Sequence, residues 1–333
     1  MRMKKELRDM SELTCIIIGG GHAGIGALKS IKEATKGNTN GNRIRFVLID
    51  KYPGHVPKVK LFRPAVDDGE IMVPWTQLFP NEVEFVQGKV TSVNKDEKQI
   101  QYTDAQGKNV QIRYDLLVVT VGSIVRQPDS HLGGIALTEP QTAVEIKERW
   151  RQNLQKAVDE KDPEERKRLM TIVVAGAGIS GMETSAELVY AMRREAESLG
   201  LNPHDASVYL LNAKERLFQE GPEKVGVRLE RLLNEYGVTV LHNCKAIGEE
   251  AGVIKLNNGD YLSAGLLVWT IGLVPNPALR TMGLPLTSEG QVQVDECYRV
   301  HGTPGVYSIG DCAGIIDPKT GKTLGEHYYF DVD

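Results

Sequence analysis

Short apolar runs alternate with a glycine turn and a helical pattern at the start of the chain. Residues 15–18 form an apolar run, rich in isoleucine, that stops at consecutive glycines. Apolar residues at helical spacing follow over 23–34, and a second apolar strand is predicted over 44–49, where Asp50 ends it. The order strand, glycine turn, helix, strand predicts one βαβ unit.

The polarity pattern changes twice before the middle of the chain. Residues 51–72 are irregular and rich in proline, with a basic cluster that includes Lys58 and Lys60. Short alternating runs then predict antiparallel strands, at 83–86, 90–93, 99–102 and 110–114. A continuous apolar run over 116–121, which stops at Gly122, is typical of a buried strand.

The second half of the chain repeats the opening pattern after a charged helix over 138–159 and a polar surface segment over 160–168. In this second copy a strand, a glycine turn, a helix and a strand are predicted at 171–175, 176–181, 182–197 and 208–211. The apolar run 266–271 and Gly272 then repeat the buried strand and the glycine of the first copy. A pattern that recurs in the same order indicates an internal duplication.

The duplication predicts an α/β fold with two Rossmann-type dinucleotide-binding domains. A chain of 333 residues is long enough for two domains of ordinary size. Each domain should have a core of three layers.

The first glycine turn has the spacing of a dinucleotide-binding motif. In the segment GGGHAG at 19–24, Gly19 permits a tight turn, Gly21 has no side chain to obstruct a pyrophosphate, and Gly24 allows close packing of helix on strand. The helix N-terminus offers N–H groups to the phosphates. Asp50 can accept hydrogen bonds from a ribose. Strand, helix and acid together favour a cofactor site over an ordinary turn.

The second glycine turn, GAGISG at 176–181, meets the same tests. Its three glycine positions are occupied by Gly176, Gly178 and Gly181. The strand after it ends at Asn212, where a carboxylate would select NAD by repelling a 2′-phosphate. Lys214 and Arg216 lie just beyond, and they either pair with that phosphate or are solvated surface residues. The choice between NADH and NADPH stays open.

Composition excludes several classes of function. A hydrophobic share of 41% and a charged share of 25% are ordinary for a soluble globular protein. The net charge of −4 provides no field that would recruit nucleic acid or anionic lipid. There is no apolar run long enough to cross a bilayer and no signal-peptide core. We expect a cytoplasmic protein, free or at the cytoplasmic face of a membrane. The four cysteines have no metal-binding spacing, so we expect structural thiols and no metal.

A further apolar strand near the C-terminus ends in Gly-Asp, at Asp311. With it the chain resembles the pyridine nucleotide–disulfide oxidoreductase superfamily, flavoproteins with two dinucleotide-binding domains. The resemblance covers residues 14–313 and implies that Asp311 contacts the ribityl chain of FAD. It also implies that the first domain is discontinuous and binds FAD, and that the second binds NAD(P). We therefore expect the FAD-binding domain over 10–140 and 290–333, and the NAD(P)-binding domain over 165–285. The segments VTVG and WTIG, which end at Gly122 and Gly272, match the domain-crossing motifs of the superfamily except for Val or Ile before the glycine.

Within the superfamily the chain is most similar to the type II NADH dehydrogenases. The segments that carry this likeness are YDLLV at 114–118, GMETSAEL at 181–188, VWTIG at 268–272 and GDCA at 310–313. The resemblance implies an enzyme that passes hydride from NAD(P)H to FAD and electrons on to a quinone-type acceptor, and it permits a homodimer. His55 belongs to the loop that this family places beside the flavin.

Candidate catalytic residues follow from this likeness. Glu183 matches the glutamate that the type II enzymes carry near the nicotinamide, although it also fits an exposed residue in the first turn of a helix. Lys58 or Lys60 would stabilise the negative charge of a reduced flavin, unless both are ordinary loop lysines.

Departures from the superfamily leave two alternatives. No cysteine lies between Cys15 and Cys244, so the paired cysteines of disulfide reductases are missing. A sulfide:quinone reductase needs two reactive cysteines beside the flavin, and Cys244 and Cys297 match those positions poorly.

The tail 325–333 does not match the Ala-Gln segment that leads into the membrane-surface region of type II enzymes. We therefore expect a truncated chain or a shortened relative, with membrane contact only through a C-terminal region absent here. The other alternative is a non-catalytic redox sensor that binds NAD(P)H and FAD.

Overall fold

The chain forms two compact units in the computed structural model, which describes residues 12–36, 43–80 and 83–316. The first unit comprises those described residues that fall within Met1–Pro57, Met72–Ile124 and Pro275–Asp333, and the second comprises Lys58–Ile71 and Val125–Val274. The polar segment 37–42 between the first predicted helix and the second predicted strand, and the tail 325–333, lie outside the described residues.

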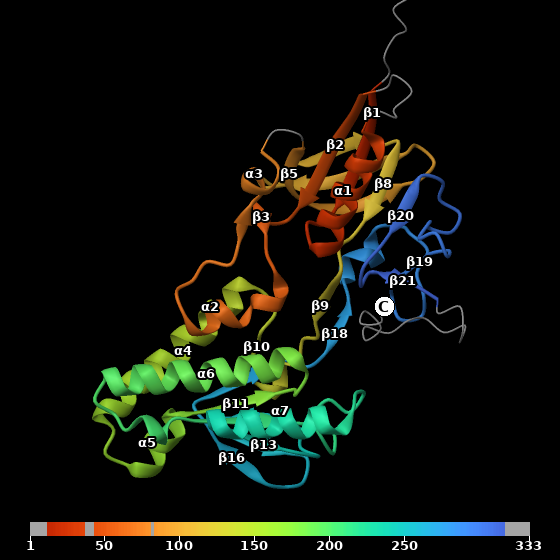
Figure 1. Ribbon diagram of the computed structural model, residues 1–333. Coiled ribbons are helices and arrows are strands. Elements are labelled where there is room, and N and C mark those ends of the chain that lie inside the picture. The colour runs from red at the N-terminus through yellow and green to blue at the C-terminus, as the bar shows by residue number, and fades with distance from the viewer. Residues whose placement is uncertain (1–11, 37–42, 81–82, 317–333) are drawn as a thin grey trace, which may run out of the picture. The chain divides into compact units, whose positions relative to one another are not determined.

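The first unit is built on a seven-stranded sheet in the order β20-β8-β1-β2-β5-β6-β7 (Figure 1). Its strands are β1 (Glu12–Ile18), β2 (Arg43–Asp50), β5 (Glu84–Asn94), β6 (Gln99–Asp104), β7 (Asn109–Arg113), β8 (Leu116–Val119) and β20 (Val306–Ser308). From β20 to β5 neighbouring strands are parallel, whereas β5, β6 and β7 form an antiparallel meander. Helix α1 (His22–Thr35) joins β1 to β2, as predicted.

Successive residues of β1 point to opposite faces of this sheet and so enter two different cores. Ile17 packs toward α1, where Ala27 and Leu28 are buried against it. Ile16 and Ile18 face the other side, which is covered by the meander and by residues between 278 and 315. The unit therefore has three layers, as expected, although only one outer layer is helical.

One strand prediction is wrong. The expected strands 83–86 and 90–93 are a single strand, β5, and its first part pairs in parallel with β2 rather than antiparallel. Its second part turns to pair antiparallel with β6, with a register shift between Val90 and Ser92. Gly88 lies between the two expected strands and inside β5. The strand continues through Gly88, and this position requires glycine because the backbone of Thr103 approaches it too closely to admit a Cβ atom.

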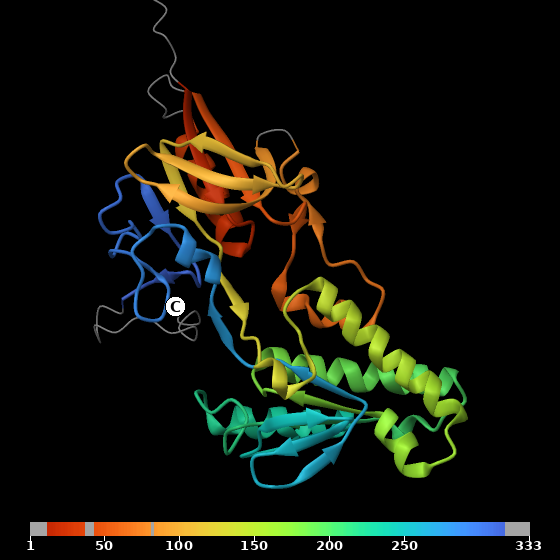
Figure 2. The ribbon, with the colours of Figure 1, turned by 180° about the vertical axis from the view of Figure 1, so that it is seen from behind.

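The second unit is built on a five-stranded parallel sheet in the order β10-β17-β11-β12-β13. Its strands are β10 (Ile135–Ala136), β11 (Thr171–Ala175), β12 (Ser207–Leu211), β13 (Val238–Leu241) and β17 (Leu266–Trp269). The helices α4 (Pro140–Asp159), α6 (Ile179–Ser198) and α7 (Glu223–Tyr236) cover one face. A small antiparallel sheet of β14 (Ala246–Glu250), β15 (Val253–Leu256) and β16 (Tyr261–Ser263) covers the other (Figure 2).

Two helices of this unit were not predicted. The polar segment expected at 160–168 contains α5 (Pro163–Leu169), which Asp162 caps by accepting a hydrogen bond from the N–H of Glu164. The helix α7 was missed as well, although Gly237 ends it in the left-handed conformation, with φ of 94°. An N-cap followed by proline, and a glycine after an amphipathic run, are the signals that would have found them.

The duplication predicted from the sequence is present in the topology. The order β8-β1-β2-β5 in the first sheet matches β17-β11-β12-β13 in the second, and every neighbouring pair in both is parallel. In each sheet the glycine turn follows the first strand of the βαβ unit, which is β1 in the first sheet and β11 in the second. The α/β fold with two Rossmann-type units, the first discontinuous, is confirmed.

The segment 58–71 belongs with the second unit, although the chain enters and leaves it from the first. Its helix α2 (Phe62–Val66) packs against α4 and α6. The indole N–H of Trp150 donates to the carbonyl of Ala65 at 2.9 Å, and the ammonium of Lys147 donates to Asp68 at 2.6 Å. The segment 58–71 itself lies inside the expected first domain of 10–140, but these contacts join it to helix α4 of the second unit. The unit boundaries fall at 124 and 275, where we expected 140 and 290.

The remaining short elements complete the description. They are β3 (Gly54–His55), β4 (Val73–Pro74), α3 (Trp75–Leu78), β9 (Ser123–Val125), β18 (Leu273–Pro275), β19 (Val292–Gln293) and β21 (Ala313–Gly314). Among the described residues, no helix is long and apolar enough to cross a membrane.

Candidate functional site

The first glycine turn is closed by backbone contacts to both neighbouring strands. Gly19 has φ of 101°, which favours glycine, and its N–H donates to the carbonyl of Ile49 at 2.8 Å. The hydroxyl of Thr120 donates to the carbonyl of Gly19 at 2.7 Å. A Cβ atom on Gly24 would collide with that same carbonyl. Gly19 and Gly24 are therefore required by the turn and by helix packing, as predicted for such a motif.

The second glycine turn repeats these contacts. Gly176 has φ of 115°, and its N–H donates to the carbonyl of Leu211 at 3.1 Å. The hydroxyl of Thr270 donates to the carbonyl of Gly176 at 2.8 Å, and a Cβ atom on Gly181 would collide with that carbonyl. The two turns have the same backbone architecture.

The middle glycines differ from these because nothing inside the protein requires them. Gly21 and Gly178 precede α1 and α6, their backbones are extended, and no atom of the described residues lies within 4 Å of an ideal Cβ at either position. Gly122 and Gly272, with φ of 64° and 61°, also face open space. A side chain would fit at Gly21 and Gly178 in the protein alone, so open space beside a helix N-terminus fits a bound phosphate group.

The residues at the ends of the second strands are held in different ways. Asp50 accepts from the N–H of Gly20 at 2.6 Å and from the N–H of Tyr52 at 2.8 Å. Asn212 lies at the equivalent position, because Gly19 bonds the residue before Asp50 and Gly176 bonds the residue before Asn212. Asp50 thus binds its own glycine turn.

Asn212 is buried and is bonded away from its glycine turn. Its carbonyl oxygen accepts from the N–H of Lys214 at 3.2 Å, and its amide nitrogen lies 2.9 Å from Nδ1 of His242. Nε2 of His242 lies 3.1 Å from a carboxylate oxygen of Glu230. This series of three hydrogen-bonded side chains was not predicted from the sequence, because His242 and Glu230 belong to no recognisable motif.

The two cations beyond Asn212 are not simply solvated. Lys214 forms an ion pair with Glu220. The guanidinium of Arg216 donates to the carbonyls of Phe218 and Gln219, each at 2.8 Å, and to that of Gly221 at 2.9 Å. Most of the N–H groups of Arg216 are therefore used in holding its own loop, which argues against its use as a phosphate ligand.

Asp311 lies in the first unit, with Ser123 beside it. The hydroxyl of Ser123 donates to a carboxylate oxygen of Asp311 at 2.7 Å, and the side-chain amide of Gln291 donates to the Asp311 carbonyl at 3.2 Å. Because Ser123 directly follows Gly122, the structure brings together two predicted site residues that are far apart in the sequence.

The predicted catalytic residues all fall in the second unit. Glu183 is exposed in the first turns of α6, where partial burial of its carboxyl group and the nearby Glu187 raise its pKa above the ordinary value. Lys58 and Lys60 lie together on one exposed 3₁₀ turn that precedes α2. The Glu183 carboxyl is thus poised nearer neutral pH than an isolated glutamate.

All four cysteines are described, and three of them are buried. Burial raises the pKa of Cys15 to about 12 and also raises the pKa of Cys312. Burial and the nearby Asp260 raise the pKa of Cys244. Cys297 is exposed. The raised pKa values disfavour the thiolate form, which is the nucleophile in thiol chemistry.

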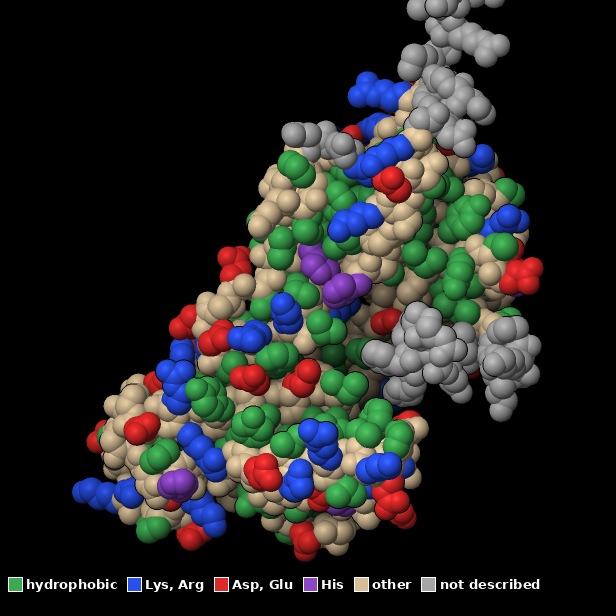
Figure 3. Space-filling model, in the orientation of Figure 1, with side chains coloured by type: hydrophobic (Ala, Val, Ile, Leu, Met, Phe, Trp, Pro, Cys, Tyr) green, Lys and Arg blue, Asp and Glu red, His purple; other side chains and the backbone are tan. Residues whose placement is uncertain are grey.

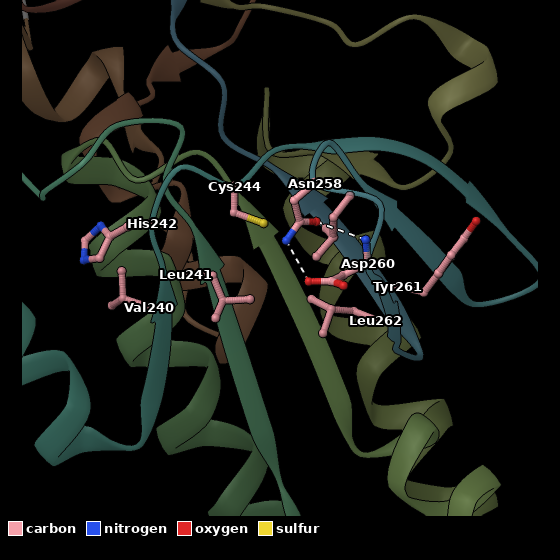
Figure 4. A pocket seen from close by; sticks show the side chains of 9 residues that line it. Val240, Leu241, His242, Cys244, Asn258, Asp260, Tyr261 and Leu262 are labelled. Carbon is pink, nitrogen blue, oxygen red and sulfur yellow. Dashed lines mark hydrogen bonds between the residues drawn. The ribbon is translucent and has the colours of Figure 1, made fainter.

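The surfaces of the second unit add little to the site. Figure 3 shows cationic, anionic and apolar side chains mixed over the visible face of this unit. A hollow of about 420 Å³ lies between β13 and the β15–β16 hairpin, where His242, Cys244 and Tyr261 are among its lining residues (Figure 4). Asn258 and Asp260 line it too, but they bond to each other within the hairpin turn at 2.7 Å. None of the predicted site residues lines this hollow.

Comparison with known proteins identifies relatives over most of the chain. Oxidoreductase ptaL of Pestalotiopsis fici is 28% identical over an alignment of 327 residues, and the match covers 91% of this chain and 78% of the relative. The type II NADH:quinone oxidoreductase of Haemophilus influenzae is 25% identical, over 93% of this chain and 75% of the relative. The predicted likeness to type II NADH dehydrogenases is confirmed.

The structure of NDH2 from Plasmodium falciparum in complex with NADH superimposes with a TM-score of 0.78. The sequences are 20% identical, and the match covers 91% of this chain and 65% of that one. This likeness confirms the fold. The sequence pattern of the pyridine nucleotide-disulphide oxidoreductase family matches residues 13–326, and the chain therefore belongs to that family of oxidoreductases, in which FAD is the typical flavin.

Proposed function

We propose that the protein is an FAD-dependent NAD(P)H oxidoreductase that passes electrons to a quinone-type acceptor. The observation that carries the proposal is the pair of glycine turns with one backbone architecture, each open at its middle glycine, Gly21 or Gly178. A protein that binds two dinucleotides needs two such turns.

The first unit would hold FAD. Gly19, Gly21 and Gly24 shape the turn, and Gly21 leaves room for the pyrophosphate beside the N–H groups of α1. Asp50 lies next to the turn and has acceptor oxygens for a ribose. The remaining FAD ligands that we propose are Gly122 and Asp311, and the hydrogen bond from Ser123, the residue after Gly122, to Asp311 supports a shared site for them.

The second unit would bind NADH or NADPH through Gly176, Gly178, Gly181, Asn212 and Gly272. When bound, FAD supplies the hydride acceptor and the route by which electrons leave one or two at a time. The protein contributes position and charge. We assign to Glu183 a place near the nicotinamide, where burial and the nearby Glu187 raise the pKa of its carboxyl group above the ordinary value. We assign to Lys58 and Lys60 the stabilisation of negative charge on the reduced flavin.

The quinone acceptor is supported by the names of relatives, such as the NADH:quinone oxidoreductase of Haemophilus influenzae. The raised pKa of each of three cysteines weighs against a sulfide:quinone reductase, which needs reactive thiolates. A cytoplasmic location and a homodimer remain part of the proposal, drawn from the sequence and the resemblance.

One spectroscopic experiment tests the proposal. The purified protein should show the visible absorption of bound flavin, which bleaches when NADH or NADPH is added without oxygen and returns when a short-chain quinone follows. The variant Gly178→Val should keep the flavin but fail to bleach. A protein that cannot be loaded with FAD, or whose bound flavin neither nucleotide reduces, would contradict the proposal.

A further inference from the structure

Gly20 lies inside the first glycine turn, and side chains hold both of its peptide groups. Its N–H donates to Oδ2 of Asp50 at 2.6 Å, and its carbonyl lies 2.8 Å from Nδ1 of His55. A carbonyl oxygen only accepts hydrogen bonds, so Nδ1 of His55 must carry a proton. His55 is 8% exposed, which shields this bond from competing water.

The bond to His55 sets the direction of the next peptide N–H. The carbonyl of Gly20 and the N–H of Gly21 belong to one planar trans peptide and point in opposite directions. By holding the carbonyl, His55 turns the N–H of Gly21 away from itself. Gly21 is the N-cap of α1, so this N–H lies beside the N–H groups that have no acceptor within the helix.

Aromatic packing keeps the His55 ring in place. The rings of His22 and His55 meet edge to face with centroids 4.9 Å apart, and the ring of Trp75 lies 6.3 Å away on a tilted plane. The indole of Trp75 lies so close to Gly20 that a Cβ atom there would collide with it. His22, Trp75 and Asp50 are the groups that face the pair formed by Gly20 and His55.

The second turn lacks this support. Ala177 replaces Gly20, and Asn212, at the position of Asp50, is bonded to Lys214 and His242 instead. In the described part of the chain, no side chain forms a hydrogen bond with the carbonyl of Ala177. Both turns have the same backbone, and a threonine hydroxyl holds the first glycine of each, but only in the first turn do side chains also hold the second residue, through Asp50 and His55.

We propose that His55 is a positioning residue that pre-forms the phosphate-binding turn for FAD by fixing the peptide between Gly20 and Gly21. The proposal rests on the proposed binding of FAD at the first turn. A turn that is ordered before binding spares the ligand the cost of ordering it, and so holds the ligand more tightly. That suits a flavin that stays bound through many turnovers. A nicotinamide nucleotide must leave after each turnover, which suits a turn without the added hold.

Three substitutions at His55 separate the hydrogen bond from the bulk of the ring. In His55→Asn the side-chain amide places an N–H near the position of Nδ1, whereas His55→Gln places it one methylene farther out. His55→Phe keeps a ring and removes the donor. The exposed His204→Asn, in the second unit, is the matched control. The measurements are the FAD dissociation constant of the flavin-free protein, its NADH dissociation constant and its melting temperature.

We expect His55→Asn and His204→Asn to bind FAD within a few-fold of the parent protein. His55→Gln and His55→Phe should weaken FAD binding by about tenfold to a hundredfold, because the carbonyl of Gly20 loses its donor. NADH binding to all variants should be unchanged. Amide hydrogen exchange of the flavin-free protein should be faster at Gly21 in the Gln and Phe variants.

The inference is overturned if all three His55 variants bind FAD as the parent does, or if Asn is as weak as Gln and Phe. Equal losses of FAD and NADH binding would also overturn it, because they would show a general structural effect. Should His55→Phe fail to fold, the Asn and Gln pair still decides. A parent protein that binds no FAD would instead overturn the proposed function, and this inference with it.

Discussion

The two glycine turns share a backbone and differ in the side chains around it. In both, a threonine hydroxyl holds the carbonyl of the first glycine, at Thr120 and Thr270. Around the first turn, Asp50 and His55 bind the turn itself, whereas around the second Asn212 binds its own loop and His242. Backbone shape follows from glycines and close packing, while the strength and selectivity of binding depend on the residues that differ between the copies.

The largest expected effect comes from filling the open glycine of each turn. Gly21 and Gly178 are extended, with φ of −71° and −69°, so valine fits both backbones without strain. We expect Gly21→Val to lower the affinity for FAD by more than about a hundredfold, because the valine side chain occupies the phosphate position. Gly178→Val should lower the affinity for NADH to a similar extent. Flavin content and NADH titration measure the two losses.

The valine variants have an internal control in Gly24→Ala. A Cβ atom there would collide with the carbonyl of Gly19, so this change should lower the melting temperature of the flavin-free protein as well as its affinity for FAD. Gly21→Val should leave that temperature nearly unchanged. Stoichiometric flavin in Gly21→Val would show that the first turn does not bind FAD.

The next effect concerns the choice of nicotinamide nucleotide, where Asn212 takes the place of Asp50. We expect the parent protein to use both NADH and NADPH, since no carboxylate at 212 repels a 2′-phosphate. Asn212→Glu should shift the ratio of kcat/KM toward NADH by about tenfold to a hundredfold. Asn212→Gln is the uncharged control, and an unchanged ratio in the glutamate variant would remove Asn212 from the ribose site.

Arg216 provides the complementary test at the same turn. Its guanidinium holds three carbonyls of its own loop, so Arg216→Ala should lower the melting temperature more than it alters the preference for NADPH. A selective loss of NADPH use, with stability unchanged, would restore Arg216 as a phosphate ligand.

The sequence was sufficient to predict features that depend on local residue type. The turns, the helices that follow them and the buried strands were predicted because glycine, β-branched residues and helical spacing act over a few positions. The pairing of β5 with two partners was not, since it depends on backbones distant in sequence. No spacing rule points to the side chains that surround the turns, because they come from later parts of the chain. His55 and Trp75 contact Gly20, and His242 contacts Asn212. The placement of 58–71 with the second unit depends on Trp150 and Lys147, far along the chain.

A smaller effect should distinguish the helices that follow the two turns. Glu183 lies two residues after Gly181, and the equivalent position after Gly24 is Gly26, beside which there is open space. The raised pKa of Glu183 means that ionisation of its carboxyl group destabilises the folded state relative to the unfolded state. The protonated carboxyl group makes its full contribution to the free energy of unfolding below the unfolded pKa of about 4.3, and this contribution is lost as pH rises through the folded pKa. Glu183→Gln should therefore gain melting temperature relative to the parent protein as pH rises from about 4 to 7.

The same substitution should slow flavin bleaching by NADH several-fold if the Glu183 carboxyl holds its proton near the nicotinamide. Glu197→Gln, at an exposed position near the other end of α6, is the control and should follow the parent protein in both measurements. A melting-temperature difference that does not vary with pH would show that the Glu183 carboxyl is an ordinary surface group.

The smallest expected effect is that of removing every thiol. Cys15 occupies in β1 the position that Ile172 occupies in β11, since each is the first residue of its strand to pair with the buried strand beside it. A position that holds isoleucine in the other copy calls for an apolar side chain, and the raised pKa of Cys15, about 12, agrees with an inert thiol.

Replacing Cys15, Cys244 and Cys312 by alanine and Cys297 by serine should leave the rate of NAD(P)H-driven flavin bleaching within a few-fold of the parent rate. The melting temperature should fall, because alanine leaves small cavities at the three buried sites. Stopped-flow bleaching of the folded, flavin-loaded variant is the measurement, and a collapse of its rate would show that a thiol takes part and would favour the sulfide:quinone reductase alternative.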